Sequence, residues 1–172
     1  FKIEDIDVYY PGNKIKIIKH LSCYRKGNDN IYEDIWLNKE AIYSITNCKI
    51  SDLISKTIME ECKKPIYDLN DLDNITIADC TACIGGNSMS FIRNFSKLIC
   101  IEIDPNTSLL LSENLKTIKN RMKIKNKYNI KEGSFYNDKN KQILQNNANI
   151  LFIDPPWMNE GETENEFKKK KE

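Results

Sequence analysis

Histidine is almost absent from this sequence of 172 residues, since His20 is the only one. Of the six cysteines, only Cys80 and Cys83 have the spacing of a paired metal or redox motif. One Cys-x-x-Cys pair with a single histidine cannot complete a usual four-ligand zinc site. A redox pair normally opens a helix, whereas this pair straddles the end of a predicted strand. We therefore expect no metal, and reduced, structural cysteines in an intracellular protein of the nucleus or cytoplasm.

Long apolar runs and an excess of charge of one sign are also missing. No segment is apolar for long enough to span a bilayer and no secretory signal is visible, so we expect no membrane association. The net charge of +1 gives no global electrostatic reason to bind nucleic acid. Basic residues do cluster at 14–19, 123–131 and 168–171. A solvated face is the commoner explanation of such clusters, and a phosphate contact the less common one.

The composition is that of one domain with its own core, at 40% hydrophobic and 30% charged residues. The sequence begins with Phe1, and we expect it to be part of a longer chain. Residues 63–74 are polar, contain Pro65 and predict a connecting loop. A helix is predicted over 51–61, with an apolar stripe formed by Ile50, Leu53, Ile54, Ile58 and Met59.

From residue 75 onwards, short apolar runs alternate with helical segments. Helices are predicted at 87–95, 106–120 and 137–147, the last being a polar helix or a loop. Strands are predicted at 75–80, 98–103, 128–132 and 148–153, the last apolar on both faces. This alternation predicts an α/β fold whose strands form one parallel sheet with right-handed crossovers, in the order 3-2-1-4.

A glycine turn follows the first predicted strand, between Asp79 and Asn87. A nucleoside-type cofactor needs main chain close to its polar groups, and Gly85 and Gly86 permit that approach. Two glycines alone would indicate no more than a tight turn. Glu102 adds support because it ends the next predicted strand, where a carboxylate can accept both ribose hydroxyls. The competing interpretation of Glu102 is a solvated strand end.

The most specific motif is Asp154-Pro155-Pro156-Trp157, directly after the last predicted strand. Two prolines cannot continue a strand ladder, so they fix an extended main chain whose carbonyls point into the crevice. Acceptors around an exocyclic amine orient its hydrogens and favour the lone pair aimed at an electrophile. The Trp157 ring could stack on a base, and a cationic 7-methylguanine would add about 1 to 2 kcal/mol. The motif predicts methylation of a nucleobase amine; the alternative is a turn with a buried tryptophan.

In combination, these motifs resemble the trimethylguanosine synthases, which are RNA cap guanine-N2 methyltransferases with an S-adenosylmethionine-dependent Rossmann-like fold. The family's glycine loop reads roughly Asp-x-Phe-x-Gly-x-Gly-Gly-Asn. The residues of this sequence that match this loop and the family's other motifs are Asp79, Gly85, Gly86, Asn87, Phe91, Ile101 to Pro105, and Pro155 to Trp157. Upstream, Ser44-Ile45-Thr46 stands where the family has Ser-Val-Thr. The match covers about Ile35 to Trp157, with an apparent insertion at 63–74.

The resemblance implies an N-terminal extension over 1–48 that contributes to the cofactor and cap pockets, a methyltransferase core over 49–157 and a charged tail over 158–172, which we expect to be disordered. It also implies further strands that this sequence lacks. The expected partner is RNA with a 7-methylguanosine cap, bound by a monomer. The implied S-adenosylmethionine contacts are Thr46, Asp79, Gly85, Gly86, Asn87, Glu102 and Ser134. The implied catalytic residues are Asp154, Pro155, Pro156 and Trp157, and substrate contacts come from Trp157 and Ser44.

Three residues depart from the family pattern. Cys83 replaces the first loop glycine, where it would crowd the methionine part of the cofactor. Ser134 stands where the family has an aspartate for the adenine amine, and Asp154 replaces a serine, as in adenine-N6 methyltransferases. Two alternatives stay open: an amino-methyltransferase acting on adenine N6 or on guanine within RNA, and a degenerate module that binds cap or cofactor without turnover. The cofactor loop precedes Asp-Pro-Pro-Trp, which argues against the messenger-RNA adenine methyltransferases.

Overall fold

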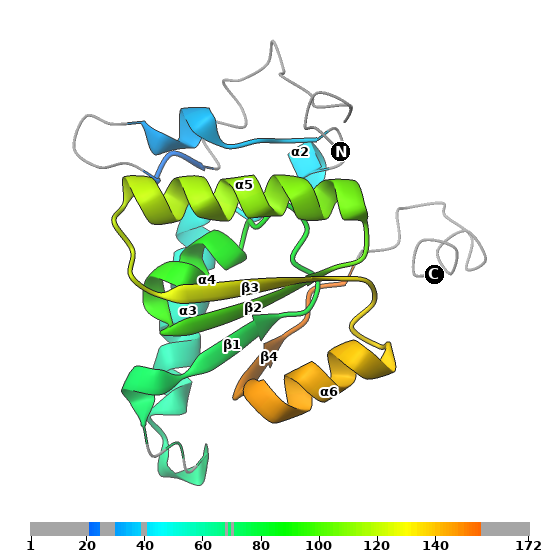
Figure 1. Ribbon diagram of the computed structural model, residues 1–172. Coiled ribbons are helices and arrows are strands. Elements are labelled where there is room, and N and C mark those ends of the chain that lie inside the picture. Colours follow the sequence, from blue (N-terminus) through cyan, green and yellow to red (C-terminus); the bar gives the residue numbers. More distant parts are fainter. Residues whose placement is uncertain (1–20, 25–29, 39–40, 68, 70, 156–172) are drawn as a thin grey trace, which may run out of the picture.

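A four-stranded parallel sheet forms the centre of the protein (Figure 1). The computed structural model describes residues 21–24, 30–38, 41–67, 69 and 71–155. The strands are β1 (Thr76–Asp79), β2 (Lys97–Glu102), β3 (Lys127–Glu132) and β4 (Ile150–Phe152). They lie in the order β3-β2-β1-β4, with every neighbouring pair parallel. The predicted fold class, strand order and strand direction are therefore confirmed.

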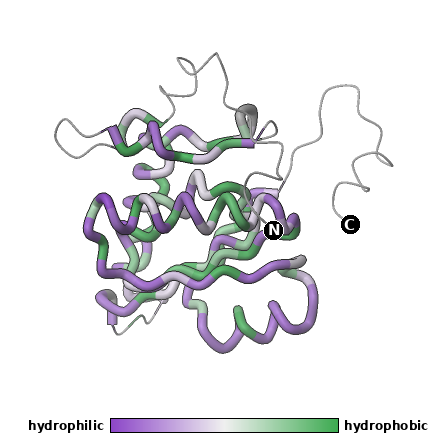
Figure 2. Tube along the Cα trace, turned by 45° about the horizontal axis from the view of Figure 1, so that its top comes forward, coloured by the Kyte–Doolittle hydropathy of each residue, from purple (hydrophilic) through white to green (hydrophobic). Residues whose placement is uncertain are grey.

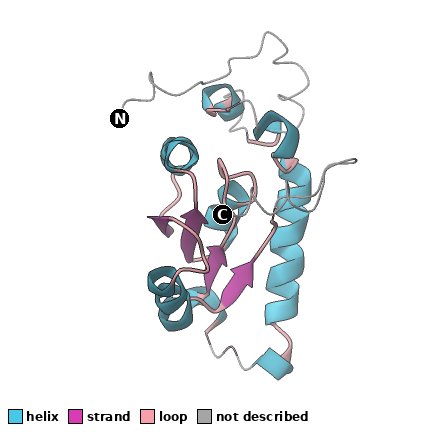
Figure 3. Ribbon diagram, turned by 90° about the vertical axis from the view of Figure 1, so that its right-hand side faces the viewer, coloured by secondary structure: helices cyan, strands magenta, loops and turns pink. Residues whose placement is uncertain are grey.

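Helices cover both faces of the sheet, as Figure 3 shows from the side. The crossover helices are α4 (Ser88–Asn94), α5 (Pro105–Arg121) and α6 (Asp138–Asn147). α5 begins where Asp104 accepts a hydrogen bond from the Thr107 amide, with Pro105 in the first turn. α6 begins at an equivalent cap made by Asn137, which shows that the polar segment is a helix rather than a loop.

The core is divided between the two faces of the sheet. The larger cluster joins α4 and α5 to alternate strand residues such as Ile77 and Leu98. The smaller cluster joins α6 to the intervening residues, including Ala78 and Ile99, through Leu144. This alternation follows from the two-residue period of a strand. In Figure 2 the hydrophobic colour is concentrated in the central strands, and α6 is mainly hydrophilic.

The helix α3 (Cys48–Cys62) packs on α4, and Ile54, Ile58 and Met59 of its predicted stripe contact the core. Ile50 and Leu53 are 53% and 63% exposed, so the prediction of an inward stripe is wrong for these two residues. Ser51 and Ser55 are fully buried instead. The inward face is polar because hydrogen bonds satisfy it, and a count of apolar residues could not reveal those partners.

The segments outside the sheet are short. The region before the core contains η2 (Ile31–Asp34) and α2 (Ala41–Ser44). The predicted loop 63–74 includes two single turns of 3-10 helix, η3 (Pro65–Tyr67) and η4 (Leu72–Asn74). No helix in the described ranges is both long and apolar enough to cross a bilayer. The predicted charged tail, Pro156 and Trp157 lie outside the described residues.

Two further expectations are corrected. β4 is only half-buried, with Leu151 52% exposed, because β4 is an edge strand among the described residues. The structure also joins Cys23 and Cys48 in a disulfide, with their Cα atoms 6.0 Å apart, so the prediction of six reduced cysteines is wrong for this pair. A separation of 25 residues gave no sign that the first cysteine lies against the start of α3. Cys62, Cys80, Cys83 and Cys100 are free.

Candidate functional site

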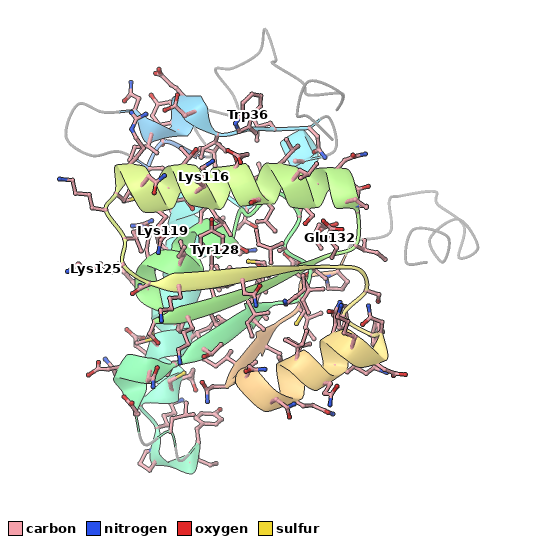
Figure 4. The ribbon with its side chains drawn as sticks, in the orientation of Figure 1. Trp36, Lys116, Lys119, Lys125, Tyr128 and Glu132 are labelled. Atoms are coloured by element: carbon pink, nitrogen blue, oxygen red, sulfur yellow. A yellow bond between two sulfur atoms is a disulfide. The ribbon has the colours of Figure 1, made fainter. Side chains whose placement is uncertain are left out.

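The candidate site lies at the carboxyl ends of the strands. Asp79 ends β1, Glu102 ends β2, and Asp154 follows β4 by two residues. The chain turns to opposite sides of β1 to form β2 and β4, so this edge contains the switch point at which open α/β sheets bind ligands. Ser134 follows β3 at the same edge, where Gly133 donates its amide to the Glu102 carbonyl at 2.9 Å. In Figure 4, Glu132 marks this end of β3.

The Glu102 carboxylate is held by the main chain on both sides. One oxygen accepts from the Cys83 amide at 2.7 Å, and the other accepts from the Asp104 amide at 3.0 Å. Burial raises the pKa of Glu102, although these amides oppose the shift. Since the side chain is only half-buried and cannot swing freely, it presents a fixed acceptor to a ligand. The ribose contact of Glu102 stays a prediction.

Asp79 is buried below the same edge, with 1% of its surface exposed. Its Oδ2 accepts from the Ser88 hydroxyl at 2.6 Å, while Oδ1 has no hydrogen-bond partner among the described residues. The pKa of Asp79 is raised to about 6, mainly by burial; the Ser88 hydroxyl and the Thr81 amide oppose the shift, and the charges of Asp154 and Glu102 add to it. A buried acceptor without a donor is costly, so Oδ1 suits a ligand that brings a donor or a positive charge.

The glycine turn between β1 and α4 has a conformation that requires glycine at one position. Gly85 has φ +100°, and a Cβ there would lie 2.9 Å from Leu111 Cδ1. At Gly86, which has no such φ, a Cβ would lie 3.0 Å from the Thr46 nitrogen. The two glycines therefore let the turn pack closely against α5 and against the segment that precedes the core.

We expect Gly85→Ala to lower the free energy of unfolding by about 1 to 2 kcal/mol, because alanine is strained at this positive φ. Its Cβ would also displace the Leu111 side chain in the core. Urea denaturation followed by circular dichroism measures the change. An unchanged midpoint and slope in the variant would contradict the conformation of this turn.

Cys83 adopts a left-handed conformation, with φ 49°, at the position where the resembling family has glycine. A non-glycine residue thus occupies a conformation that glycine adopts more readily. Burial raises the pKa of the Cys83 thiol to about 11, and the Ser44 hydroxyl lies beside it. A thiol with this pKa stays protonated at neutral pH, so Cys83 is not an activated nucleophile. Ser44, for which the resemblance implies a substrate contact, thus lies beside the glycine turn.

The segment before the core is fastened to the glycine turn. Asn87 Nδ2 donates to Thr46 Oγ1 at 3.0 Å, which brings two predicted cofactor residues together. Ser51 Oγ donates to the Gly86 carbonyl at 3.0 Å, and the Tyr24 hydroxyl donates to the same carbonyl at 3.4 Å. The sequence reasoning missed Ser51 and Tyr24. The Ser51 and Ser55 spacing of one helical turn was the available signal for a polar inward face.

Asn114 is a second anchor that the sequence reasoning missed. This fully buried residue of α5 accepts from the Trp36 amide at 2.7 Å and donates to the Trp36 carbonyl at 3.0 Å. It also donates to the Ile84 carbonyl at 2.9 Å. One side chain thus joins the N-terminal segment, α5 and the glycine turn. A lone asparagine within the apolar stripe of α5 was the signal for such a role.

The start of the Asp-Pro-Pro-Trp motif is also fixed to the turn that follows β1. The Asp154 amide donates to Thr81 Oγ1 at 2.9 Å, and the side chains of Asp154 and Pro155 are exposed. The structure therefore brings together Thr46, Asp79, Gly85, Gly86, Asn87, Glu102, Ser134, Asp154 and Pro155 at one edge of the sheet. Among the described residues, no group of three or more His, Cys, Asp or Glu side chains is placed to hold a metal ion.

Comparisons with known proteins identify the family of this chain. The model of the family described as conserved hypothetical protein 95 matches residues 52–171. No curated protein matches the sequence. A solved structure from Porphyromonas gingivalis W83, assigned as a methyltransferase, is 17% identical with a TM-score of 0.47 over 64% of this chain. That likeness is too partial to support an argument about activity, and the chain spans only 23% of that protein. The chain belongs to the conserved hypothetical protein 95 family, which is a family of S-adenosylmethionine-dependent methyltransferases with a Rossmann-like fold.

Proposed function

We propose that this protein transfers a methyl group from S-adenosylmethionine to the N2 amine of guanine in a 7-methylguanosine RNA cap. The observation that carries the proposal is the group of carboxylates at the carboxyl ends of β1, β2 and β4. Asp154 and Glu102 both act on the charge of Asp79, which places the three in one electrostatic site. S-adenosylmethionine and 7-methylguanine are both cationic, so this negative site favours the two proposed reactants together.

The residues at the glycine turn fit the cofactor. Glu102 offers a fixed carboxylate for the ribose hydroxyls, and the orphaned Oδ1 of Asp79 offers an acceptor for a cationic or donor group. Thr46 and Asn87 close the side of the turn that faces the N-terminal segment. Ser134 is proposed to contact the adenine, since it lies beyond β3 at the same edge. S-adenosylmethionine supplies a methyl group on a sulfonium, which leaves without prior activation by the protein.

The main contribution of the protein is then to position the guanine amine. We propose that the Asp154 carboxylate and the Pro155 carbonyl accept hydrogen bonds from the N2 amine, which aims the nitrogen lone pair. As the N–C bond forms and the bond from methyl to sulfur breaks, the Asp154 carboxylate accepts the proton that the nitrogen loses. The hydrogen bond from the Asp154 amide to Thr81 fixes the start of the Asp-Pro-Pro-Trp motif to the turn that follows β1. Trp157 is proposed to stack on the cationic base and Ser44 to contact it from the N-terminal side. Delivery in the correct geometry is worth several kcal/mol in reactions of this kind.

Support for a cap comes from the segment 35–46. This segment lies outside the residues that the family model matches, yet it carries the resemblance to cap methyltransferases. Asn114 links Trp36 of this segment to the glycine turn, and Thr46 accepts a hydrogen bond from Asn87. A segment fastened at this place can shape the substrate pocket as well as the cofactor pocket.

The second candidate substrate is an amine on a base within an RNA chain. Members of the conserved hypothetical protein 95 family methylate ribosomal RNA, which favours guanine in a structured RNA. Asp154 before the proline pair favours adenine N6 instead, as noted for the adenine methyltransferases. A degenerate domain that binds cap or cofactor without turnover is the third possibility. Titration with S-adenosylhomocysteine, followed by a transfer assay, separates the three.

Trp157→Ala should reduce transfer to a 7-methylguanosine cap by about tenfold, because a cation–π contact of about 1 to 2 kcal/mol is lost. Phenylalanine at the same position should restore part of the activity, since it keeps an aromatic face. Affinity for S-adenosylhomocysteine should stay nearly unchanged in both variants and serves as the control for folding. Radiolabelled methyl transfer gives the rate, and parental activity in Trp157→Ala would contradict the stacking role.

A further inference from the structure

Basic residues are segregated in one part of this nearly neutral chain. The segment 116–131 contains seven basic residues and no acidic one: Lys116, Lys119, Arg121, Lys123, Lys125, Lys127 and Lys131. The whole chain has a net charge of +1, so removing these seven charges leaves −6 on the remaining residues. Such a separation creates a local positive field that the overall charge conceals.

The segment runs from the end of α5 through a short loop and along β3, which is an edge strand among the described residues. In Figure 4, Lys116 and Lys119 lie on α5, and Lys125 extends from the loop that leads into β3. Lys123, Lys125 and Lys127 are exposed, and Lys131 is half-buried further along β3. These basic residues therefore begin away from the candidate site and approach it along β3.

Part of this charge is already used within the fold. Lys119 donates to the Asn126 and Lys125 carbonyls, Arg121 pairs with Asp34, and Lys116 lies 3.6 Å from Glu113. Within the part of the chain that the structure describes, no carboxylate forms an ion pair with Lys123, Lys125, Lys127 or Lys131. These four residues, called the β3 lysines below, can neutralise an external anion without breaking an internal contact.

The candidate site itself cannot hold an RNA backbone by charge, since Asp79, Glu102 and Asp154 would repel phosphates. The β3 lysines supply the opposite sign beside it. Lys131 pairs in register with Ile101, one residue before Glu102. Lys127 lies four residues earlier, which is about 13 Å along a strand.

We propose that the β3 lysines bind the phosphate backbone of the RNA that carries the target base, and so hold it along β3 while the base enters the acidic site. This inference rests on the proposed function, because it assumes that the substrate is RNA. It assigns two separate tasks by charge: the carboxylates favour the cationic reactants, and the lysines hold the polyanion. Contacts of this kind position a nucleic acid without reading its sequence.

Lysines on an edge strand can also have a simpler purpose, which is to prevent pairing with another chain. That purpose accounts for Lys127 and Lys131 only, because Lys123 and Lys125 precede β3 in the loop. Unchanged RNA affinity after removal of these lysines, together with new self-association, would identify edge protection and overturn the proposal.

The test compares two variants with equal loss of charge. In one, the β3 lysines are replaced by glutamine, as K123Q, K125Q, K127Q and K131Q. The control carries K49Q, K56Q, K63Q and K139Q, which are exposed residues on α3, at its end and on α6. Both variants should keep the parental circular dichroism spectrum and S-adenosylhomocysteine affinity. A further variant with K123Q and K125Q alone tests the loop separately.

The first measurement is fluorescence anisotropy with a labelled, uncapped RNA of about ten nucleotides, titrated over a range of salt concentrations. Each phosphate contact to a single strand contributes about −0.7 to the slope of log affinity against log salt. The β3 variant should therefore lose about 3 from the magnitude of the slope and bind at least about tenfold more weakly at low salt. The loop variant should lose about half as much in slope, and the control variant should stay close to the parent.

The second measurement separates this inference from the proposed function. If the parent methylates capped RNA, the β3 variant should raise KM for a capped oligonucleotide but not for a cap dinucleotide, which lacks the RNA chain. If the parent methylates neither, the proposed function fails, while lysine-dependent RNA binding would still support this surface. Equal RNA affinity in the parent, β3 and control proteins, or no RNA binding by the parent, would overturn the inference.

Discussion

Glu102→Ala should weaken the binding of S-adenosylhomocysteine by about 1.5 to 3 kcal/mol, which is about a 10- to 150-fold increase in Kd. The reason is that the variant loses a charged acceptor whose direction is already fixed by the amides of Cys83 and Asp104. A ribose binding there gains two hydrogen bonds without ordering a free side chain. Calorimetric titration gives the affinity directly, without requiring an active substrate.

The matched control is Glu132→Ala. Glu132 ends β3 in register with Glu102 on β2, but it is exposed. The Glu132→Ala substitution removes the same charge beside the site, so it measures the nonspecific electrostatic contribution to cofactor affinity. Its effect should be well below that of Glu102→Ala, and Glu102→Gln should fall between the two. Equal affinities for all these proteins would contradict the assignment of Glu102 to the cofactor.

Asp79 should make the ligand-free protein less stable as the pH rises from about 4 to about 6. Burial raises the pKa of this carboxyl from 3.8 to about 6, so in this interval the folded protein holds a proton that the unfolded chain has released. Stability falls with pH wherever the folded state binds more protons. The shift of about two units corresponds to about 3 kcal/mol, and the loss is complete above pH 6.

Asp79→Asn removes this titration and should therefore gain stability relative to the parent as the pH rises. The difference in the free energy of unfolding between variant and parent should grow by about 3 kcal/mol from pH 4 to pH 7 and then level off. Urea denaturation at several pH values without cofactor measures it. The same variant should bind S-adenosylhomocysteine more weakly, because the orphaned carboxylate oxygen is replaced. A difference independent of pH would contradict the buried, ionisable Asp79.

The order of the sheet could be predicted because each step follows from local patterns. Apolar runs of strand length alternate with helical segments, and right-handed crossovers leave few ways to arrange four parallel strands. The predicted strand bounds differ from those of β1, β2 and β3 by a single residue at each end or less, whereas β4 is shorter than predicted by two residues at its start. Glu102 and the glycine turn were found for the same reason, since both have fixed places relative to the strands.

What the sequence did not reveal depends on contacts between distant segments. Asn114 joins residues 78 and 30 positions away, and nothing near it in the chain indicates those partners. From the sequence, Ser51 would be assigned to the polar surface, because its hydrogen bond to the Gly86 carbonyl cannot be foreseen. Burial of such groups is acceptable only because each has a partner. Hydrophobic periodicity contains no information on partners, so it assigned Ile50 and Leu53 of α3 to the core and left Ser51 and Ser55 outside it.

The most direct test of the proposed function is radiolabelled methyl transfer from S-adenosylmethionine to three substrates under one condition: a 7-methylguanosine cap analogue, the unmethylated cap, and uncapped RNA containing both guanine and adenine. We expect transfer to the 7-methylguanosine cap at the guanine N2 amine, and much slower transfer to the other two, because the acidic site favours the cationic base. Equal transfer to capped and uncapped RNA would contradict the cap assignment, and no transfer despite tight S-adenosylhomocysteine binding would contradict the proposal of an active enzyme.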